Sequence, residues 1–442
     1  MENLQVGYGR VNITPDYPVS MAGGASKRIS EGFADPLYIT FIALRQGEET
    51  LLIATMDFVG SYEEFAVPAR TRVSQATGIP EDHVILNSTH THSSVAIRHE
   101  DGVGILRYRE DFYNWAEEAA KAALADLSDA NVFYTSAQTK GMNWVRHYKM
   151  ADGTYAGANY GSFKNSTIVG HASDPDCEMQ LIKFQRPAEG KKDIILMAYP
   201  AHATKMQKSI LLSADFPGPA REYIAENTGA LVAYFIAGAG DQVPSSRIPE
   251  EHFSDDYQVF GKEVGRIAVE ALQNLTPVNE TALRFSQRTF TGPSNQHDLD
   301  RLDEAKAVSA IWEQVGGRGT PEGKKAAKEN GFSSVYAVTA ILNRARFKPT
   351  RSLVLRTLAI GNISMIFAPY EMFGASAMQI KDGSPYDMTF IVSCSQNHDG
   401  YMPSKLGWQL MCYEAQITRF APGTAERLAE EYVDMLKESK KV

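Results

Sequence analysis

Short apolar runs rich in β-branched residues recur along this chain of 442 residues, and they set the narrowest limit on its fold. Runs of this kind, bounded by polar or turn-forming residues, predict buried β-strands. Apolar residues also follow helical spacing at 110–127, at 260–275 and at roughly 423–440. The alternation predicts an α/β fold in which layered mixed β-sheets are covered by helices. The predicted strands are YITFIAL, TLLIATM, HVIL, MQLIKF, DIILMAY, LVAYFIA, SLVLRTLAI, ISMIFA and MTFIVS.

The sequence shows no sign of a division into domains. It contains no internal repeat, no low-complexity segment and no long linker, so we predict one large domain over 1–442. Apolar residues make up 43% of the chain, which suffices for a sizeable core. The exception is a polar, glycine-rich stretch at about 292–332, which we expect to form a helical excursion with a solvated, lysine-rich face.

Composition excludes several classes of protein. The formal net charge of -9 argues against a protein held on nucleic acid by phosphate contacts. The three cysteines include no C-x-x-C pair, so we expect buried thiols and no disulfide framework. No apolar run approaches the ~18 residues of a membrane span, and no signal peptide is visible, so we expect a cytoplasmic protein. A homo-oligomer is compatible with the sequence, which shows no heptad pattern.

Polar side chains follow five of the predicted strands directly. Ligands of α/β proteins gather beyond the carboxyl ends of strands, so this pattern predicts a site. Imidazole, carboxylate and phenolate groups are all suitable zinc ligands, but no compact motif such as H-E-x-x-H joins them. On chemistry alone, a metal site and ordinary loop roles both remain open. The residues are His90, His92, His202, Asp241, Glu371, His398, Asp399 and Tyr401.

Seven segments resemble, in order, the motifs of the neutral, non-lysosomal ceramidase family. The resemblance extends from about residue 6 to about residue 415 and implies that family's catalytic domain. We expect the carboxyl-terminal β-sandwich domain of the longer, secreted members to be absent. The segments are VGYGRVNITP, STHTHSS, YPAHAT, LLSADFPG, GAGDQVP, FAPYEMF and GYMPSKLGWQLMCYEA.

The resemblance implies a site with one Zn²⁺ ion. The implied zinc ligands are His90, His202, Glu371 and Tyr401. Three further residues would act in catalysis near the attacking water and the oxyanion: His92, Arg146 and Tyr413.

Zinc lowers the pKa of bound water from about 15.7 towards about 7, and the resulting hydroxide can attack a carbonyl carbon. We therefore predict a zinc-dependent hydrolase of a carbon–nitrogen bond other than a peptide bond. Its substrate is a ceramide-like N-acyl lipid or another amide, lactam or ester. The alternative is a non-catalytic or metal-free binding protein on the same scaffold.

Val243 stands where the family motif carries a serine, so a nucleophilic serine is not expected there. Ser245 and Ser246 are expected to be ordinary loop hydroxyls.

Several local expectations complete the prediction. In an extended segment, residues i and i+2 share a face, so His90 and His92 should lie on one side. We predict substrate contacts for Asp241, His398 and Asp399, although Asp241 could equally cap its loop. The stretch at about 292–332 could cover the mouth of the site and select the substrate. The Gly-Tyr-Gly at 7–9 is too weak a pattern for a nucleotide-binding loop.

Overall fold

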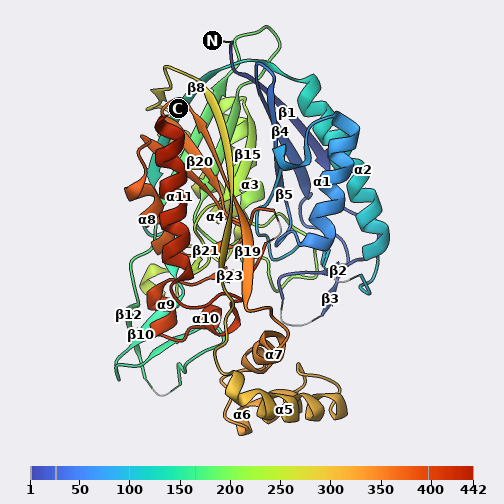
Figure 1. The fold of residues 1–442 in the computed structure, drawn as a ribbon, viewed down its shortest axis with the longest axis vertical. Coiled ribbons are helices and arrows are strands. Elements are labelled where there is room, and N and C mark those ends of the chain that lie inside the picture. The colour runs from blue at the N-terminus through green and yellow to red at the C-terminus, as the bar shows by residue number, and fades with distance from the viewer. Residues whose placement is uncertain (1, 25–26, 99, 165, 397, 442) are drawn as a thin grey trace.

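Three β-sheets with the same construction form the body of the protein (Figure 1). The computed structural model describes residues 2–24, 27–98, 100–164, 166–396 and 398–441. In each sheet, three antiparallel strands are followed by a helix and then by a fourth strand that pairs in parallel with the third.

The first unit comprises β1 (Gln5–Asn12), β4 (Tyr38–Gln46), β5 (Glu49–Met56), α1 (Glu63–Thr77) and β6 (Val84–Ser88). The second comprises β8 (Asn131–Gln138), β13 (Glu178–Gln185), β14 (Ile194–Tyr199), α3 (Pro217–Thr228) and β15 (Leu231–Ile236). The third comprises β18 (Leu283–Pro293), β19 (Thr350–Ile360), β20 (Ile363–Phe367), α8 (Gly374–Gly383) and β22 (Met388–Val392). The repeat is one of topology, and the sequence does not reveal it.

The parallel edge strands of the three sheets converge. β15 lies against β5, β6 and β22, and hydrogen bonds link the segments that follow these strands. The Ser88 N–H donates to the Cys394 carbonyl, and the Ser393 N–H donates to the Ile236 carbonyl. The described residues of β6, β14, β20 and β22 are all buried, as expected of parallel strands covered on both faces.

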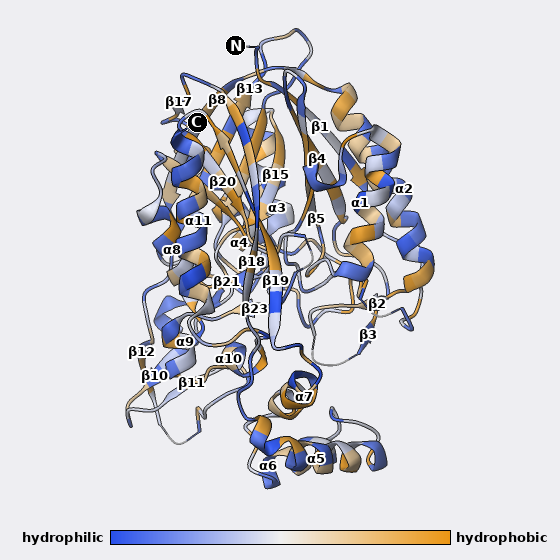
Figure 2. Cartoon of the chain, in the orientation of Figure 1, coloured by the Kyte–Doolittle hydropathy of each residue, from blue (hydrophilic) through white to orange (hydrophobic). Residues whose placement is uncertain are grey.

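Helices cover the outer faces of the sheets, and this confirms the predicted α/β fold with layered mixed sheets. α1 and α2 (Ile105–Ala125) pack on the first sheet, α3 and α4 (Tyr257–Ala271) on the second, and α8 and α11 (Thr424–Lys441) on the third. Figure 2 shows apolar strands inside and helices with polar outer faces. One core cluster includes Ile53, Leu196 and Met365, which come from the three different sheets.

Three helices form an insertion between β18 and β19, seen at the bottom of Figure 1. They are α5 (Leu302–Gln314), α6 (Pro321–Glu329) and α7 (Val335–Arg344). The hairpin partners Pro293 and Thr350 mark where the insertion leaves and rejoins the sheet. It has a small core of its own that includes Val308, Trp312 and Ile341. The predicted excursion at about 292–332 thus covers α5 and α6, and the helical segment continues to Arg344.

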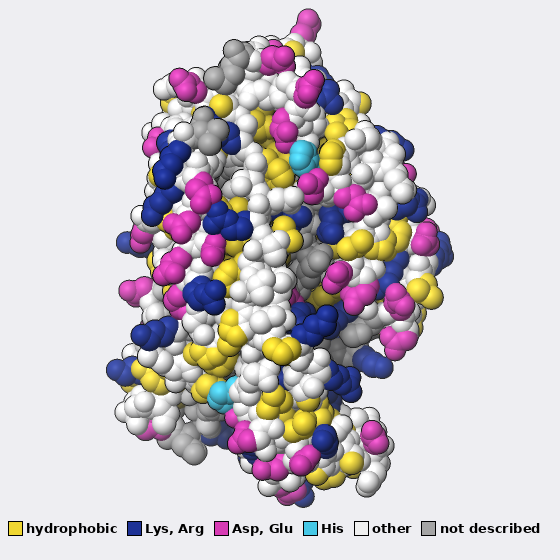
Figure 3. Space-filling model, in the orientation of Figure 1, with side chains coloured by type: hydrophobic (Ala, Val, Ile, Leu, Met, Phe, Trp, Pro, Cys, Tyr) yellow, Lys and Arg dark blue, Asp and Glu magenta, His cyan; other side chains and the backbone are white. Residues whose placement is uncertain are grey.

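Acidic and basic side chains are interspersed over the face of the molecule seen in Figure 3. Among the described helices, we find none with the length and apolar character that crossing a bilayer requires.

The glycines at positions 7 and 9 allow α2 to lie directly on β1. A Cβ on Gly9 would stand 2.1 Å from the Ala119 carbonyl oxygen, and one on Gly7 would stand 2.0 Å from that of Ala123. The Gly-Tyr-Gly pattern is therefore a packing requirement of the helix–sheet contact.

We predict that Gly9→Ala destabilises the protein, because the added methyl group forces α2 away from β1. Overpacking of this kind costs about 1–3 kcal/mol, which thermal unfolding followed by calorimetry would detect as a lower Tm. The control is Gly319→Ala, since a Cβ at that exposed position meets nothing within 4 Å. Equal melting temperatures for the two variants would contradict the prediction.

Candidate metal centre

Side chains that follow three different strands meet at one buried point. His90 follows β6, His202 follows β14, and Glu371 follows β20. Glu371 Oε2 lies 3.3 Å from His90 Nε2 and 3.2 Å from His202 Nε2. The three side chains are almost completely buried. The convergence of the strand ends is what brings together residues so far apart in the sequence.

Backbone carbonyls hold the histidine rings of this cluster in one tautomer. His202 Nδ1 lies 2.7 Å from the Ala239 carbonyl, His92 Nδ1 lies 2.9 Å from the Gly23 carbonyl, and His90 Nδ1 bonds to the carbonyl of Val59. A neutral imidazole that donates from Nδ1 keeps its lone pair on Nε2. One nitrogen from each of the three rings lies within 4.8 Å of the other two, and the Nε2 atoms of His90 and His92 are 3.2 Å apart, so the rings converge on one small space.

Two atoms at this point lack the partner that burial normally demands. His202 Nε2 and Glu371 Oε2 are buried without a hydrogen-bond partner among the described residues. Leaving a buried polar atom unsatisfied costs about 1–3 kcal/mol, and more for a charged group. A cation between them would satisfy both, and imidazole nitrogen with carboxylate oxygen suits zinc. The donor set therefore fits a divalent metal ion.

Tyr401 joins the cluster through a short parallel ladder. β21 (Glu371–Met372) pairs with β23 (Tyr401–Met402), and this pairing sets Tyr401 beside Glu371. The Tyr401 ring lies 6.5 Å from the His202 ring, measured between centroids. The structure thus brings together all four residues predicted as zinc ligands.

His92 lies on the same side of the chain as His90, with 3.2 Å between their Nε2 atoms. The expected backbone was wrong, however. His90 has a φ of 65°, in the left-handed region, and the segment is not extended. Gly23 makes room for the His92 backbone, because a Cβ there would stand 2.4 Å from the His92 Cα. Burial, and then the neighbouring His90 and His202, lower the pKa of His92 well below its usual range.

Arg146 belongs to a buried charge network that no sequence pattern predicted. Its Nε donates to Glu414 at 2.7 Å, and one terminal nitrogen donates to the Gly240 carbonyl at 2.8 Å. His147 Nε2 lies 3.0 Å from the other Glu414 oxygen. Burial alone would raise the pKa of Glu414, but Arg146 and His147 outweigh it and lower that pKa. The carboxylate fixes the guanidinium 5.4 Å from the centre of the Tyr401 ring.

Tyr413 begins α10 (Tyr413–Ile417) and stands at the rim of the cluster. Its ring centroid lies 6.0 Å from that of Tyr401 and 5.4 Å from that of Tyr336. Because Tyr336 belongs to α7, the insertion touches a residue predicted to act in catalysis.

Two of the three predicted substrate contacts, Asp241 and Asp399, are engaged by residues outside the metal-centre cluster. The Asp241 carboxylate accepts a hydrogen bond from the Gly374 N–H at the start of α8, a segment outside its own loop. Asp399 forms ion pairs with Arg351 and Arg419. Their contact with a substrate stays a prediction.

His398 lies within the metal-centre cluster itself. It is buried, with Nε2 3.1 Å from Glu371 Oε1. Cys394 Sγ lies 3.6 Å from His90 Nδ1, so this thiol is buried as expected but also borders the histidines. No spacing motif in the sequence would have identified Cys394 as a neighbour of the cluster. A substrate contact for His398 stays a prediction.

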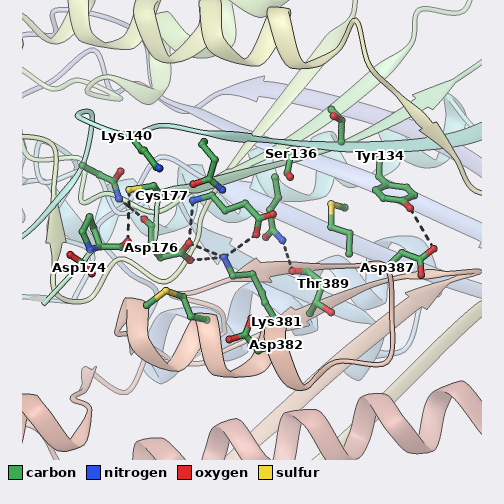
Figure 4. Close-up of a pocket in the computed structure, with 18 of the residues that line it drawn as sticks. Tyr134, Ser136, Lys140, Asp174, Asp176, Cys177, Lys381, Asp382, Asp387 and Thr389 are labelled. Carbon is green, nitrogen blue, oxygen red and sulfur yellow. Dashed lines mark hydrogen bonds and ion pairs between the residues drawn. The ribbon is translucent and has the colours of Figure 1, made fainter.

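A large polar cavity lies elsewhere, with a volume of about 1050 Å³ (Figure 4). Lys381 crosses it, with Nζ 2.8 Å from Asp176 and 2.9 Å from Glu178. None of the predicted site residues lines this cavity, so it is separate from the metal centre.

Two solved structures share the fold of this chain. The neutral ceramidase from Pseudomonas aeruginosa superimposes with a TM-score of 0.72 at 15% identity, over 100% of this chain and 75% of that one. A ceramidase complexed with C2 gives 0.69 at 15% identity, over 99% and 75%. No family model and no curated protein matches the sequence. The fold is neutral ceramidase-like, as the sequence motifs predicted.

We predict near-stoichiometric zinc in the purified protein and its loss in His202→Ala and Glu371→Gln, because each change removes a ligand atom from the cluster. Mass spectrometry with a plasma source measures the metal. His252→Ala is the control, since that side chain is exposed, is not part of the cluster and should leave the metal content unchanged. A wild-type protein that takes up no metal even after reconstitution with zinc would rule out the centre.

Proposed function

We propose that this protein is a zinc-dependent hydrolase that cleaves an amide or ester bond, with an amide other than a peptide as the first choice. The observation that supports it best is the meeting of three Nε2 lone pairs and a Glu371 oxygen at one buried point. A zinc ion held by His90, His202, Glu371 and Tyr401 would supply a Lewis acid and a water of lowered pKa.

His92 serves as the general base in this proposal. Its Nδ1–H is held by the Gly23 carbonyl, so Nε2 faces the cluster as a proton acceptor. After taking a proton, the same Nε2 can donate it to the leaving group. The hydrogen bond predicted between His92 and the attacking water is therefore one in which His92 Nε2 accepts and the water donates.

Arg146 and Tyr413 stabilise the oxyanion. Fixed donors are effective because they need no reorganisation when charge develops on the carbonyl oxygen. Glu414 and the Gly240 carbonyl hold the Arg146 guanidinium in place. The Tyr413 phenol lies next to Tyr401, on the side of the cluster that faces the insertion.

The hydroxyls near Val243 support water as the nucleophile. Ser245 Oγ accepts a hydrogen bond from Lys205 Nζ at 2.8 Å, and Ser246 Oγ accepts one from the Ile248 N–H at 3.0 Å. Ser246 Oγ also lies 3.3 Å from His171 Nε2, but that nitrogen is only 2.7 Å from Glu251, and His171 does not belong to the cluster of His90, His202 and Glu371. Valine cannot attack a carbonyl, so the residues that remain favour a water mechanism.

The substrate class rests on the fold and on the rim of the site. Two proteins of the same fold are named as ceramidases, which favours an N-acyl substrate. Other amides, lactams and esters remain as second candidates. A cluster of Tyr160, Phe373 and Trp408, with Tyr401 and Tyr413 packed against it, supplies an apolar wall. A non-catalytic binding protein is the alternative of a different class.

We predict that the zinc-loaded protein hydrolyses at least one member of a panel of N-acyl amides, lactams and esters, and that a chelator abolishes the activity. His92→Ala should retain zinc and lose about 100-fold or more in kcat, because it lacks the base. Ser245→Ala is the matched control and should keep its activity. No hydrolysis of any panel member by the zinc-loaded protein would leave the binding-protein alternative.

We predict that Tyr336→Ala changes the ratio of kcat/KM between long-chain and short-chain N-acyl substrates. The ring of Tyr336 supports Tyr413, and an aromatic pair is worth about 0.5–1.5 kcal/mol, or about 2- to 12-fold in that ratio. Tyr336→Phe keeps the ring and should keep the ratio. An unchanged ratio in Tyr336→Ala would refute the selecting role of the insertion.

A further inference from the structure

A second cavity lies at the seam between the insertion and the core, with a volume of about 180 Å³. Its size is enough for several water molecules or for one small oxyanion. The polar part of its lining combines residues of the insertion with a residue of α10: Asp298, Arg301, Ser333, Arg344 and Gln416.

Arg344, the last residue of α7, is the unusual member of this lining. It is only 3% exposed. One terminal nitrogen donates to the His297 carbonyl at 2.7 Å and the other to the Gln416 carbonyl. Its Nε is buried without a hydrogen-bond partner among the described residues. No described carboxylate lies at ion-pair distance from it, and Asp298 acts on it only from a longer distance.

Other buried arginines of the same chain show what a buried guanidinium normally requires. Three of them are ion-paired, in the pairs Arg109–Glu100, Arg186–Asp126 and Arg221–Asp57, and Arg356 is the exception. Burial of an unpaired charge is expensive, and charged side chains are rarely buried alone. Arg356 shares the unpartnered Nε but lines neither this cavity nor the large polar one. Arg344 therefore lacks an anion in a place that has room for one.

The rest of the lining also favours an anion. Arg301 adds a second guanidinium, held 4.0 Å from the centre of the Phe332 ring and anchored by Glu304. Asp298, which carries the carboxylate of this lining, lies 2.9 Å from His297 Nδ1. Arg301 and Asp298 thus each have a partner of opposite charge, and Arg344 is the charged group of this lining that has none at ion-pair distance among the described residues.

We propose that this cavity binds a small oxyanion such as phosphate, sulfate or a carboxylate, held by Arg344 and Arg301. A guanidinium presents parallel N–H groups that match the oxygens of such an ion. The bound anion would connect α7 to α10, the helix that begins at Tyr413. The site goes beyond the proposed hydrolase activity and does not depend on it.

Isothermal titration calorimetry with inorganic phosphate tests the proposal, with sodium chloride added to keep the ionic strength constant. We expect saturable binding to the full chain and a Kd at least about tenfold weaker in Arg301→Gln. Arg346→Gln removes the same charge from an exposed position of the insertion and should leave the Kd unchanged. Arg344→Gln should abolish binding. If that variant fails to fold, Arg301→Gln carries the test.

Two further arms locate the ligand and identify its source. His202→Ala should still bind phosphate, because its metal centre is impaired and the seam is intact. Loss of binding in that variant would assign the phosphate to the metal centre and overturn the proposal.

Tighter binding of glycerol phosphate than of phosphate would support an anionic group on a larger molecule, and the reverse would support the free ion. No saturable binding of phosphate, sulfate or acetate, or equal weakening in Arg301→Gln and Arg346→Gln, would also overturn it.

Discussion

The convergence of three parallel strand pairs is the constraint on which the rest of the structure depends. In each sheet a crossover helix returns the chain to pair in parallel at one edge, and the three edges meet. The polypeptide leaves these strands at nearly the same place, so side chains there share a small buried volume. Backbone carbonyls of the same segments fix the ring nitrogens of His90 and His202. The geometry of the candidate centre is thus set mainly by backbone, which side-chain substitutions elsewhere disturb little.

Buried ion pairs hold the segments of the fold in position relative to one another. Asp57, directly after β5, forms a bidentate ion pair with Arg221 of α3. This pair joins the first unit to the second. Glu414 of α10 holds Arg146 through one carboxylate oxygen, which two of the guanidinium nitrogens contact. Such pairs add little net stability because both charges lose their hydration. Removing one partner is costly, so the pairs specify position more than they stabilise the fold.

The helical insertion has a different relation to the core. It leaves and rejoins at paired residues of one hairpin, and it has its own small apolar cluster. Contacts that connect it with the region of the site include the ring contact of Tyr336 with Tyr413 and the seam around Arg344. An insertion attached in this way can vary in sequence without disturbing the sheets. It nevertheless contacts Tyr413 at the rim of the centre.

Much of the fold could be predicted, and the exceptions have a common cause. The buried runs were all found, because a strand covered on both faces is a continuous apolar stretch. The first strand of every unit was missed: β1, β8 and β18 have half-exposed faces that interrupt the pattern. The triple repetition also escaped notice, since topology depends on which strands pair and many sequences satisfy the same pairing.

The candidate site, like the fold, could be predicted only in part. By itself the sequence determined the α/β class, the strand ends that carry polar residues, and the motifs that suggested the family and its zinc ligands. Only the tertiary structure decided that His90 and Glu371 meet, that His90 adopts a left-handed backbone, and that Glu414, Cys394 and His398 complete the surroundings. Local patterns report burial and spacing along the chain. The distance between residues hundreds of positions apart follows from how sheets pack, which no local pattern encodes.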